Sequence, residues 1–495
     1  MKRFRRIALL IALLATALVA VVAYNTVRFS RDASSAPLVP SATPLALDKQ
    51  AVADRLSSAI VKRTVSYENP GEVEPAEFTA LHALLLQNFP KAHDTITRET
   101  VDTHSLLYTW NGSDPSLAPI VLMNHIDVVP IAPGTEGEWV HPPFSGAIAD
   151  GFVWGRGTLD DKGGVVALME AVETLITAGF TPKRTVLLAF GHDEEIGGAQ
   201  GAVKIVELLQ SRNVKPALVL DEGGSITQGI LPGVQSPVAL VGIAEKGYLT
   251  LELTVSDVGG HSSQPPAHTA IGILSAGITR LENNPMPARI DGPTLALFEN
   301  TGPHMGLAER VVFSNLWLFR GVVLKQLAGM PSTNATIRTS TAVTIFNSGN
   351  KENVLPATAR AVVNFRVLPG DSLDMVESHV RRVLADDRIT IARMPHAQEA
   401  SSTSDPQSAE YALLASTIQQ VCGREVIVSP YLVLGATDSR HYQPICKNIF
   451  RFSPARLTAD DLKRIHGTNE RIAIDNYIEI VNFYAQLIRN VDTMP

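Results

Sequence analysis

The chain has 495 residues, of which 45% are hydrophobic and 18% charged, and its formal net charge is −7. Because single hydrophobic cores rarely grow beyond ~250–300 residues, we expect more than one domain. The acidic balance and the lack of a basic patch with interleaved aromatic residues argue against nucleic-acid binding, and two cysteines, Cys422 and Cys446, exclude a disulfide scaffold while leaving one bridge open.

Residues 1–30 are predicted to be an N-terminal signal anchor. Residues 2–6 read Lys-Arg-Phe-Arg-Arg and precede an uncharged apolar run from Ile7 to Tyr24. A basic flank of this kind keeps the amino terminus in the cytoplasm. The run is slightly shorter than the ~20 residues that span a bilayer comfortably, yet long for a cleaved signal peptide. We favour an uncleaved anchor, with cleavage after Val21-Val-Ala23 as the alternative, and both place the body of the protein outside the cytoplasm, in the periplasm or the extracellular space.

The rest of the chain divides into a linker and two predicted domains. The linker covers residues 31–47 and is rich in Ser, Ala and Pro. The catalytic domain is predicted in two parts, residues 48–243 and 396–495, and a second domain, residues 244–395, is inserted between them. Helical spacing of apolar residues over 48–66, 76–90, 408–421 and 474–491 predicts helices that cover the sheet of the catalytic domain.

Three short apolar runs in the first part predict buried strands, at residues 120–123, 185–190 and 217–220. Helical patterns lie between them, at residues 165–178 and 202–212. This alternation predicts an α/β fold with a mainly parallel sheet and right-handed crossovers. Ligands bind outside the carboxyl ends of the strands in such sheets, so that edge is the expected site.

Acids and a histidine follow these strands or precede a helix, and the candidates are His125, Asp127, Asp160, Glu194, Glu195 and Asp221. Any one of them alone would be an ordinary loop residue, but the set at consecutive strand ends favours a site. Carboxylates held together resist joint ionisation unless a cation neutralises them. Histidine and carboxylates without cysteine fit zinc, cobalt or manganese.

These ligands are more than one metal needs, so we predict two ions, with Asp160 bridging them at about 3.5–4 Å. Asp127 lies two residues after His125 and shares its face in an extended segment. It is therefore expected to hold the far nitrogen of the imidazole. Asp161 is interpreted as the N-cap of the following helix, and Asp160 as the better ligand.

Residues 244–395 have a different pattern. Alternating apolar residues from 249 to 255 predict a half-buried strand. The predicted order is β-α-β-β-α-β, a ferredoxin-like α+β arrangement, with helices at 269–282 and 372–384 and strands at 342–347, 358–368 and 389–393. Apolar patches at 311–319 and 321–324 are either core of an enlarged domain or a wall for a long acyl chain.

Several motifs resemble the dizinc aminoacylase/carboxypeptidase family of co-catalytic metallopeptidases, the glutamate carboxypeptidase-like family. The matching segments are Asn124-His-Ile-Asp-Val-Val-Pro130, Gly155-Arg-Gly-Thr-Leu-Asp-Asp-Lys-Gly-Gly164, Asp193-Glu-Glu195, Asp221-Glu-Gly, Gly259-Gly-His-Ser-Ser263, Asn353-Val-Leu-Pro356 and His466-Gly-Thr-Asn-Glu470. Gly435-Ala-Thr-Asp-Ser439 is similar to a family loop near the substrate, although Ala436 replaces the usual second glycine. The N-terminal anchor and the enlarged inserted domain are most similar to the carboxypeptidase S and N-fatty-acyl-amino-acid hydrolase branch.

The resemblance implies roles for individual residues. One zinc ion is expected on His125, Asp160 and Asp221, and the other on Asp160, Glu195 and His466, with Co²⁺ or Mn²⁺ as alternative metals. Glu194 is implied as the general base and Asp127 as the residue that orients His125. His261 is implied to bind the substrate carbonyl or oxyanion, if need be across a homodimer formed through the inserted lid domain. Asn353 and Arg366 are implied to contact the substrate, and an exposed ion pair is the alternative for Arg366.

The predicted function is cleavage of the amide bond of N-acyl amino acids or small peptides that carry a free carboxylate. The general base acts on a water molecule activated by the metals. A dipeptidase or carboxypeptidase without acyl-chain preference is the alternative. An inactive membrane-tethered binding protein on the same fold is disfavoured because every implied ligand and the base are present.

Overall fold

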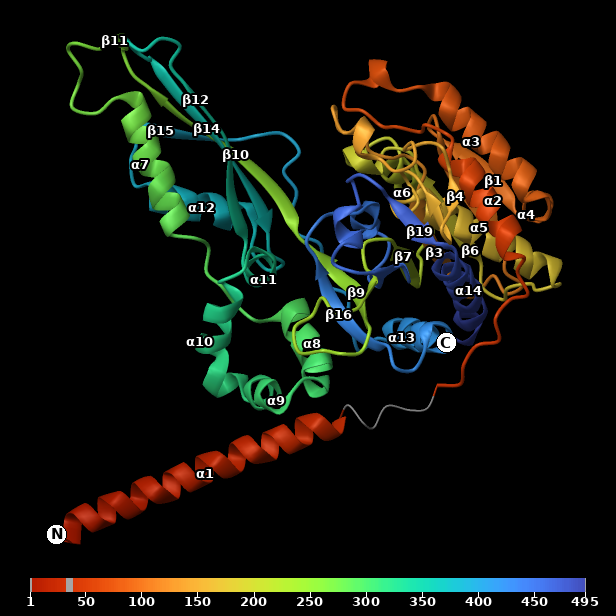
Figure 1. Cartoon of the computed structure of the whole chain (residues 1–495), viewed down its shortest axis with the longest axis horizontal. Helices are drawn as coiled ribbons and strands as arrows, with labels where there is room; N and C mark the ends of the chain where they lie inside the picture. Colours follow the sequence, from red (N-terminus) through yellow and green to blue (C-terminus); the bar gives the residue numbers. More distant parts are fainter. Residues whose placement is uncertain (1, 33–38, 495) are drawn as a thin grey trace.

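The computed structural model describes residues 2–32 and 39–494 (Figure 1). The described chain contains a long N-terminal helix, an α/β body and a smaller α+β unit. Part of the predicted linker, residues 33–38, lies outside the described residues. Residues 39–48 form neither helix nor strand and lead into the body.

The body is built on a ten-stranded sheet whose order is β1-β2-β6-β3-β7-β17-β9-β8-β18, with β16 also paired to β9. Its strands are β1 (Thr97–Val101), β2 (Ser105–Trp110), β3 (Ile120–His125), β6 (Val186–Gly191), β7 (Leu218–Asp221), β8 (Ile226–Thr227), β9 (Val238–Glu245), β16 (Ile427–Val433), β17 (Ile449–Arg451) and β18 (Arg456–Leu457). A separate small sheet joins β4 (Ile148–Ala149), β5 (Phe152–Trp154) and β19 (Arg471–Ala473).

The large sheet is mixed, which corrects the mainly parallel sheet that the sequence predicts. Its centre is parallel, because β3 pairs in parallel with both β6 and β7, and β7 with β17. One edge is antiparallel: β1 and β2 form a hairpin over residues 102–104, and β2 pairs antiparallel with β6. At the other edge β8 pairs antiparallel with β9 and in parallel with β18. A tight hairpin has no crossover helix, so its strands must run in opposite directions.

Helices cover both faces of this sheet. Alternate residues of β3 face opposite sides, so Ile120 and Leu122 belong to one core and Val121 and Met123 to the other. The larger core packs against α2 (Lys49–Ile60), α3 (Pro75–Asn88), α4 (Pro90–Thr95), α5 (Lys162–Thr177), α13 (Ala409–Cys422) and α14 (Ile474–Asn490). The smaller core lies under α6 (Ala202–Ser211). Cys422 and Cys446 are buried and free.

The second unit has a four-stranded antiparallel sheet in the order β12-β14-β10-β15. Its elements are β10 (Gly247–Ser256), α7 (Ala270–Asn283), β12 (Ser340–Ser348), β14 (Thr358–Val367), α12 (Leu373–Leu384) and β15 (Ile389–Arg393). They follow the predicted β-α-β-β-α-β order, and the two helices bury their apolar faces on one side of the sheet. A short ribbon at its tip joins β11 (Gly260–His261) to β13 (Val354–Leu355).

Four helices are inserted between α7 and β12: α8 (Gly292–Thr301), α9 (Leu307–Ser314), α10 (Leu316–Leu327) and α11 (Pro331–Ile337). They contain the predicted apolar patches and surround a small core of Ile290, Val323 and Ile337. The patches are therefore partly core, although not all of their side chains are covered.

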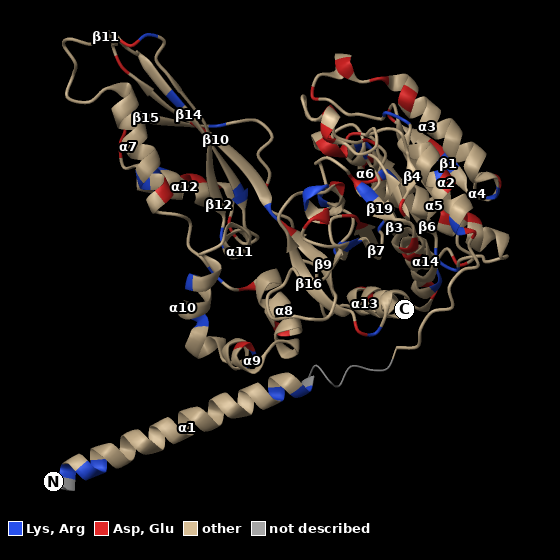
Figure 2. Cartoon of the chain, viewed as in Figure 1, with Lys and Arg blue, Asp and Glu red and all other residues tan. Residues whose placement is uncertain are grey.

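Helix α1 (Lys2–Asp32) runs beneath α9 in Figure 1 and extends away from the body. Its segment Arg3–Arg31 has a mean hydropathy of 2.7 in its most apolar window and is long and apolar enough to cross a membrane. Figure 2 shows lysine and arginine at both ends of α1 and none between. This pattern is compatible with a signal anchor or a signal peptide.

Candidate metal centre

The candidate residues reach one place from four segments of the body. His125 ends β3, and its parallel neighbour β6 ends opposite it at Gly191, just before the 3₁₀ turn η4 (Glu194–Ile196). Asp160 lies in the turn before α5, and His466 in the loop before β19. The carboxyl edge of the parallel strands therefore carries the site, as the strand pattern predicts.

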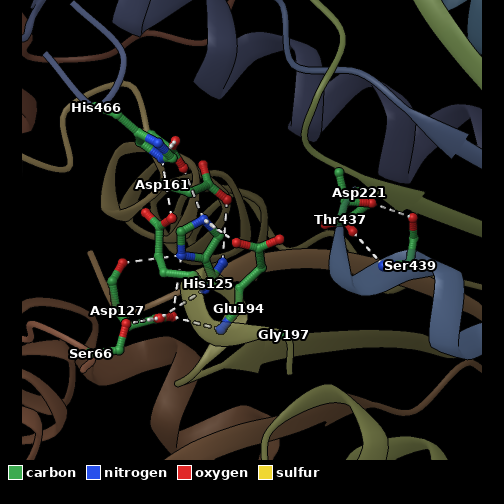
Figure 3. Close-up of polar contacts among 12 residues, drawn as sticks. Ser66, His125, Asp127, Asp161, Glu194, Gly197, Asp221, Thr437, Ser439 and His466 are labelled. Atoms are coloured by element: carbon green, nitrogen blue, oxygen red, sulfur yellow. Dashed lines mark hydrogen bonds and ion pairs between the residues drawn. The ribbon is translucent and has the colours of Figure 1, made fainter. Parts of the chain in front are cut away.

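Two histidines and two carboxylates are in direct contact there (Figure 3). His125 Nε2 lies 2.9 Å from Asp160 Oδ1, and His466 Nε2 lies 3.0 Å from Asp160 Oδ2 and 3.1 Å from Glu195 Oε2. Asp160 thus contacts both imidazoles, one through each oxygen. Glu194 Oε2 lies 4.0 Å from His125 Nε2, beside the same group.

Asp127 is fully buried and connects His125 to the Glu194–Glu195 turn. Its Oδ1 lies 3.3 Å from His125 Nδ1 and accepts a hydrogen bond of 3.2 Å from the Glu194 backbone N–H. Its Oδ2 accepts from the Ser66 hydroxyl at 2.7 Å and from the Glu195 N–H at 3.2 Å. One carboxylate therefore fixes the orientation of the imidazole and the position of the two glutamates relative to it.

Glu470 holds the turn that carries Asp160. Its Oε1 accepts from the backbone N–H groups of Gly157, Leu159 and Asp160 at 3.0, 2.8 and 3.2 Å, and its Oε2 accepts from Arg156 at 2.6 Å. The Arg156–Glu470 pair is buried. Since Glu470 is four residues after His466, this pair also ties the loop of His466 to the turn of Asp160.

Burial sets the direction of the pKa shift for the two glutamates but not for Asp160. It raises the pKa of Glu194 well above its usual range, because the charged form loses hydration. Burial also raises the pKa of Glu195, although the hydrogen bond from His466 opposes this. For Asp160, the hydrogen bonds from His125 and His466 outweigh burial and lower the pKa.

The neighbouring carboxylates raise the pKa of both imidazoles, those of His125 and His466. Hydrogen bonds to Asp160 and Glu195 raise the pKa of His466 to about 10. Burial opposes protonation of His125, yet Asp127 and Asp160 together raise its pKa well above the usual value. The negative charge of the carboxylates therefore favours protonation of the two histidines. A bound divalent cation would supply the same positive charge to the site.

The donor set fits metal ions. One ligand atom each of His125, Asp160 and Glu195 lies within 4.8 Å of the others. Glu195 Oε1 is buried without a hydrogen-bond partner, which is costly unless another ligand satisfies it. Carboxylate oxygens and imidazole nitrogens are ordinary zinc, cobalt and manganese ligands. His125, Asp160, Glu195 and His466 would hold such ions.

Asp221 lies at the end of β7, apart from this group in Figure 3. Its Oδ2 accepts from the Ser439 N–H at 2.7 Å, and Thr437 also hydrogen-bonds to it. The loop of residues 435–439 that resembles a family segment is thus packed against Asp221. Thr437 is held in turn by Glu245, which is paired with the buried Arg451 at 3.2 Å.

The next residue, Glu222, is a carboxylate that the sequence patterns did not single out. Burial, followed by the charges of Asp160 and Asp221, raises its pKa well above the usual range. Glu222 therefore lies within electrostatic reach of the candidate metal ligands. An acid directly after Asp221 is the only sequence signal for it.

Asp161 occupies the N-cap position of α5, but its side chain makes no cap hydrogen bond to the helix. Its Oδ2 instead accepts from the His125 backbone N–H at 3.3 Å. The predicted capping interaction is therefore wrong, and Asp161 supports the strand end that presents His125. Glu470 and Ser66 were missed as well, because their partners are distant in sequence and only the fold brings them together.

The implied substrate residues lie in the second unit, with His261 and Asn353 at the β11–β13 ribbon and Arg366 at the end of β14 next to the body. His261 belongs to β11, and the Asn353 carbonyl accepts a hydrogen bond from the Ser262 N–H beside it. Figure 1 shows β11 at the end of this unit farthest from the body. Arg366 is half-buried on β14, with its guanidinium 4.9 Å from the ring centroid of Tyr248, so the alternative of an exposed ion pair does not describe it.

Comparison with known proteins gives consistent results. The sequence profile of Peptidase family M20/M25/M40 matches residues 121–490. Probable carboxypeptidase S-like 2 of Dictyostelium discoideum is 41% identical over 99% of this chain and 95% of its own length. The human N-fatty-acyl-amino acid synthase/hydrolase PM20D1 is 40% identical over 90% of this chain and 89% of its own length.

Solved structures show the same fold at low sequence identity. The M20 family metallo-carboxypeptidase Sso-CP2 from Sulfolobus solfataricus superposes with a TM-score of 0.65 at 19% identity and covers 90% of this chain and 99% of its own. Human carnosine dipeptidase 1 superposes with a TM-score of 0.62 at 17% identity over 90% and 97%. The family profile covers most of the chain and the relatives cover nearly all of it. The chain therefore belongs to peptidase family M20/M25/M40 and is a metal-dependent peptidase or amidohydrolase.

Proposed function

We propose that this protein is a co-catalytic dizinc hydrolase that cleaves the amide bond of N-acyl amino acids with a free carboxylate. The observation that carries the proposal is the convergence of His125, Asp160, Glu195 and His466, with Asp160 in contact with both histidines. Such a carboxylate is suited to bridge two cations. In the proposal, Asp221 completes the sphere of the ion on His125, and Co²⁺ or Mn²⁺ can replace zinc.

Glu194 is proposed as the general base. When bound, a pair of divalent cations lowers the pKa of a water molecule and polarises the scissile carbonyl. The Glu194 carboxylate accepts the proton of the attacking water and donates it to the departing amine nitrogen, a contribution of about 10²–10⁴-fold. Asp127 holds the backbone of Glu194 and the His125 ring in fixed relation, so the base and the ligand move together.

The substrate class is proposed from the relatives, which include N-fatty-acyl-amino acid synthase/hydrolases and carboxypeptidase S. His261, Asn353 and Arg366 are proposed to bind the substrate carbonyl and carboxylate. Because β11 lies far from the metal ligands of its own chain, His261 and Asn353 are proposed to come from a second copy or from movement of the second unit. Arg366 lies at the other end of the unit, next to the body. We therefore propose that the second unit serves as lid and as homodimer interface.

Helix α1 is proposed to anchor the enzyme in a membrane, with the body in the periplasm or outside the cell. Its apolar length and the basic residues that precede it support this orientation. Cleavage and secretion remain the alternative for the same segment.

The test compares Glu194→Gln with wild type and with Glu207→Gln, a glutamate on the exposed face of α6. The glutamine is nearly isosteric, so metal content should stay unchanged while kcat for an N-acyl amino acid falls about 10²–10⁴-fold. Glu207→Gln should match wild type. Unchanged turnover in Glu194→Gln would remove it as the base.

The acyl group is tested with a panel of short-chain and long-chain N-acyl amino acids and dipeptides. Preference for long chains in kcat/KM supports the fatty-acyl substrate. Equal or better rates on dipeptides would instead identify a dipeptidase or carboxypeptidase without acyl-chain preference.

A further inference from the structure

The inserted helices α9 and α10 present apolar side chains that nothing in the described chain covers. Trp317 and Val322 are 61% and 66% exposed, and Leu318 is exposed as well. With Gly321 they occupy positions i, i+1, i+4 and i+5 of α10 and so lie on one face of this helix. We call this surface, residues 317, 318, 321 and 322, the outer face of α10.

The opposite side of α10 explains why the helix forms. Val323 is buried with Ile290 and Ile337, and Leu316 and Phe319 pack against the same core. The helix therefore has an apolar inner face in the protein and an apolar outer face in solvent. Exposed apolar surface of this kind is characteristic of a contact with a partner or a membrane.

The same helices are fixed to the carboxyl end of α1. Asn25 Nδ2 donates to Asn315 Oδ1 at 2.9 Å, and the hydroxyls of Thr26 and Ser314 are 3.1 Å apart. The ring of Phe29 packs against Gly302. These contacts lie at the end of the apolar segment of α1, so α9 and α10 stand where α1 would leave a bilayer.

The charges near the outer face suit an interface with anionic lipid. Residues 307–327 contain three basic residues, Arg310, Arg320 and Lys325, and one acid, Glu309, a net of +2 (3 − 1) in a chain of net charge −7. Figure 2 shows basic residues on α10 and at the adjacent end of α1. An exposed tryptophan next to basic residues is typical of helices that lie in the headgroup layer.

A cavity of about 890 Å³ opens at the junction of these helices with the body. Its lining combines aromatic side chains, Phe29, Phe313 and Trp317, with two arginines, Arg320 and Arg424, and two acids, Glu299 and Glu425. Trp317 belongs both to this lining and to the outer face of α10, so the exposed surface continues from α10 toward the body.

We propose that α9 and α10 lie in the headgroup layer of the membrane that α1 crosses, with the outer face of α10 immersed in lipid. The body is then held against the bilayer by two contacts, a spanning helix and an interfacial one. This inference rests on the proposed membrane anchor, and it deepens that proposal by naming the surface that meets the lipid.

Tryptophan fluorescence of the full chain in lipid nanodiscs tests the proposal. Trp110, Trp139 and Trp154 are only 4%, 8% and 5% exposed, so Trp317 is the exposed tryptophan among the four. The emission of Trp317 is the difference between the spectra of wild type and Trp317→Phe. Phosphatidylcholine/phosphatidylglycerol lipids brominated near the headgroup should quench the Trp317 emission at least twofold more than the emission of the three buried tryptophans. Iodide in the aqueous phase should quench the Trp317 emission only weakly, because lipid shields this side chain from water.

A second variant separates failure of the inference from failure of the anchor. Leu14→Trp in the Trp317→Phe background, measured with lipids brominated near the ends of the acyl chains, places a reporter in the middle of the apolar segment of α1, where Leu14 is exposed. Strong quenching of this reporter with no lipid quenching of Trp317 would overturn the inference and leave the anchor standing. Quenching of neither would overturn both. A third outcome is that neither brominated lipid nor iodide quenches Trp317 and that this protection increases with protein concentration. It would overturn the membrane contact of α10 and indicate that a second copy of the chain covers this face.

Discussion

At the scale of single residues, the geometry of the site depends on which groups the carboxylate oxygens of Asp127 and Asp160 contact. Asp127 contacts His125 and the two glutamate N–H groups, and Asp160 contacts the two histidines. Each carboxylate thus links two segments of the chain. Glu195 keeps one buried oxygen without a hydrogen-bond partner, which a further ligand such as a metal ion would satisfy.

The adjacent acids Asp221 and Glu222 allow a paired test of the ligand of the first ion. Asp221 is hydrogen-bonded by Ser439 and Thr437, as ligating carboxylates commonly are. We expect Asp221→Asn to lower the metal content by one ion per chain and Glu222→Gln to leave two, measured by mass spectrometry of the native protein. The opposite result would assign the ligand to Glu222.

At the scale of elements, the loop of His466 and the turn of Asp160 are joined by the buried Arg156–Glu470 pair. Loss of one charge from a buried pair typically costs about 3–5 kcal/mol, because the other charge stays buried and unpaired. We expect Glu470→Gln to lower the thermal midpoint by several degrees and to weaken metal binding. Calorimetry and metal titration measure the two effects.

The exposed pair Lys463–Asp460 in the same segment is the matched control for this change. Both side chains are largely exposed, so Asp460→Asn should alter stability by less than about 0.5 kcal/mol. Equal effects of Asp460→Asn and Glu470→Gln would contradict the structural role of the buried pair.

Helix α3 carries a histidine that should make the fold sensitive to acid. Burial, aided by Arg98, lowers the pKa of His82 to about 4, and its Nε2 lies 2.9 Å from the His104 carbonyl oxygen. An unfolded chain holds His82 at its ordinary pKa of about 6.5. The unfolded state therefore binds more protons between these values, so stability falls as the pH falls and the loss is complete near the folded value.

Replacement of His82 by Gln keeps a donor for His104 and removes the titration. Between pH 7 and pH 5 the wild type should lose about 1–2 kcal/mol more than His82→Gln. Thermal midpoints of both proteins at the two pH values, at fixed metal concentration, measure the difference. Equal losses would show that His82 is not held in its neutral form.

Elements with strong local patterns are predicted well from the sequence. The buried strands that end at His125, Gly191 and Asp221 and the six elements of the second unit follow from apolar periodicity. The mixed pairing at the β8–β18 edge of the large sheet does not, because β8 and β18 have two residues each and their pairing depends on distant segments. Patterns at 311–324 reveal apolar residues but not that α9 and α10 form two helices with an uncovered face.

Some residues of the candidate site are likewise predictable from local sequence patterns, and others are not. Acids at consecutive strand ends indicate a metal centre, whereas His466 is suggested only by the family resemblance. Glu470 contacts Leu159 across 311 positions of sequence, and no local pattern encodes such a contact. Asp161 shows the opposite case, where a valid capping signal is overridden by the backbone N–H of His125.

At the scale of the whole molecule, the body carries the candidate ligands, and the second unit carries His261 and Asn353 at its far tip and Arg366 at its end next to the body. Activity is therefore expected to depend on how the second unit meets a metal centre, whether its own or that of a partner. The N-terminal helix and α10 lie on another side, so the proposed membrane contact and the proposed substrate closure would use separate surfaces.

Asp160 is proposed to bridge two metal ions, and the rest of the proposed chemistry depends on this bridge. Elemental analysis of the purified full chain, run in parallel on wild type and Asp160→Asn, tests it directly. We expect two metal ions per wild-type chain and loss of both, together with activity, in Asp160→Asn. An active wild type with at most one ion, or a variant that retains two, would contradict it.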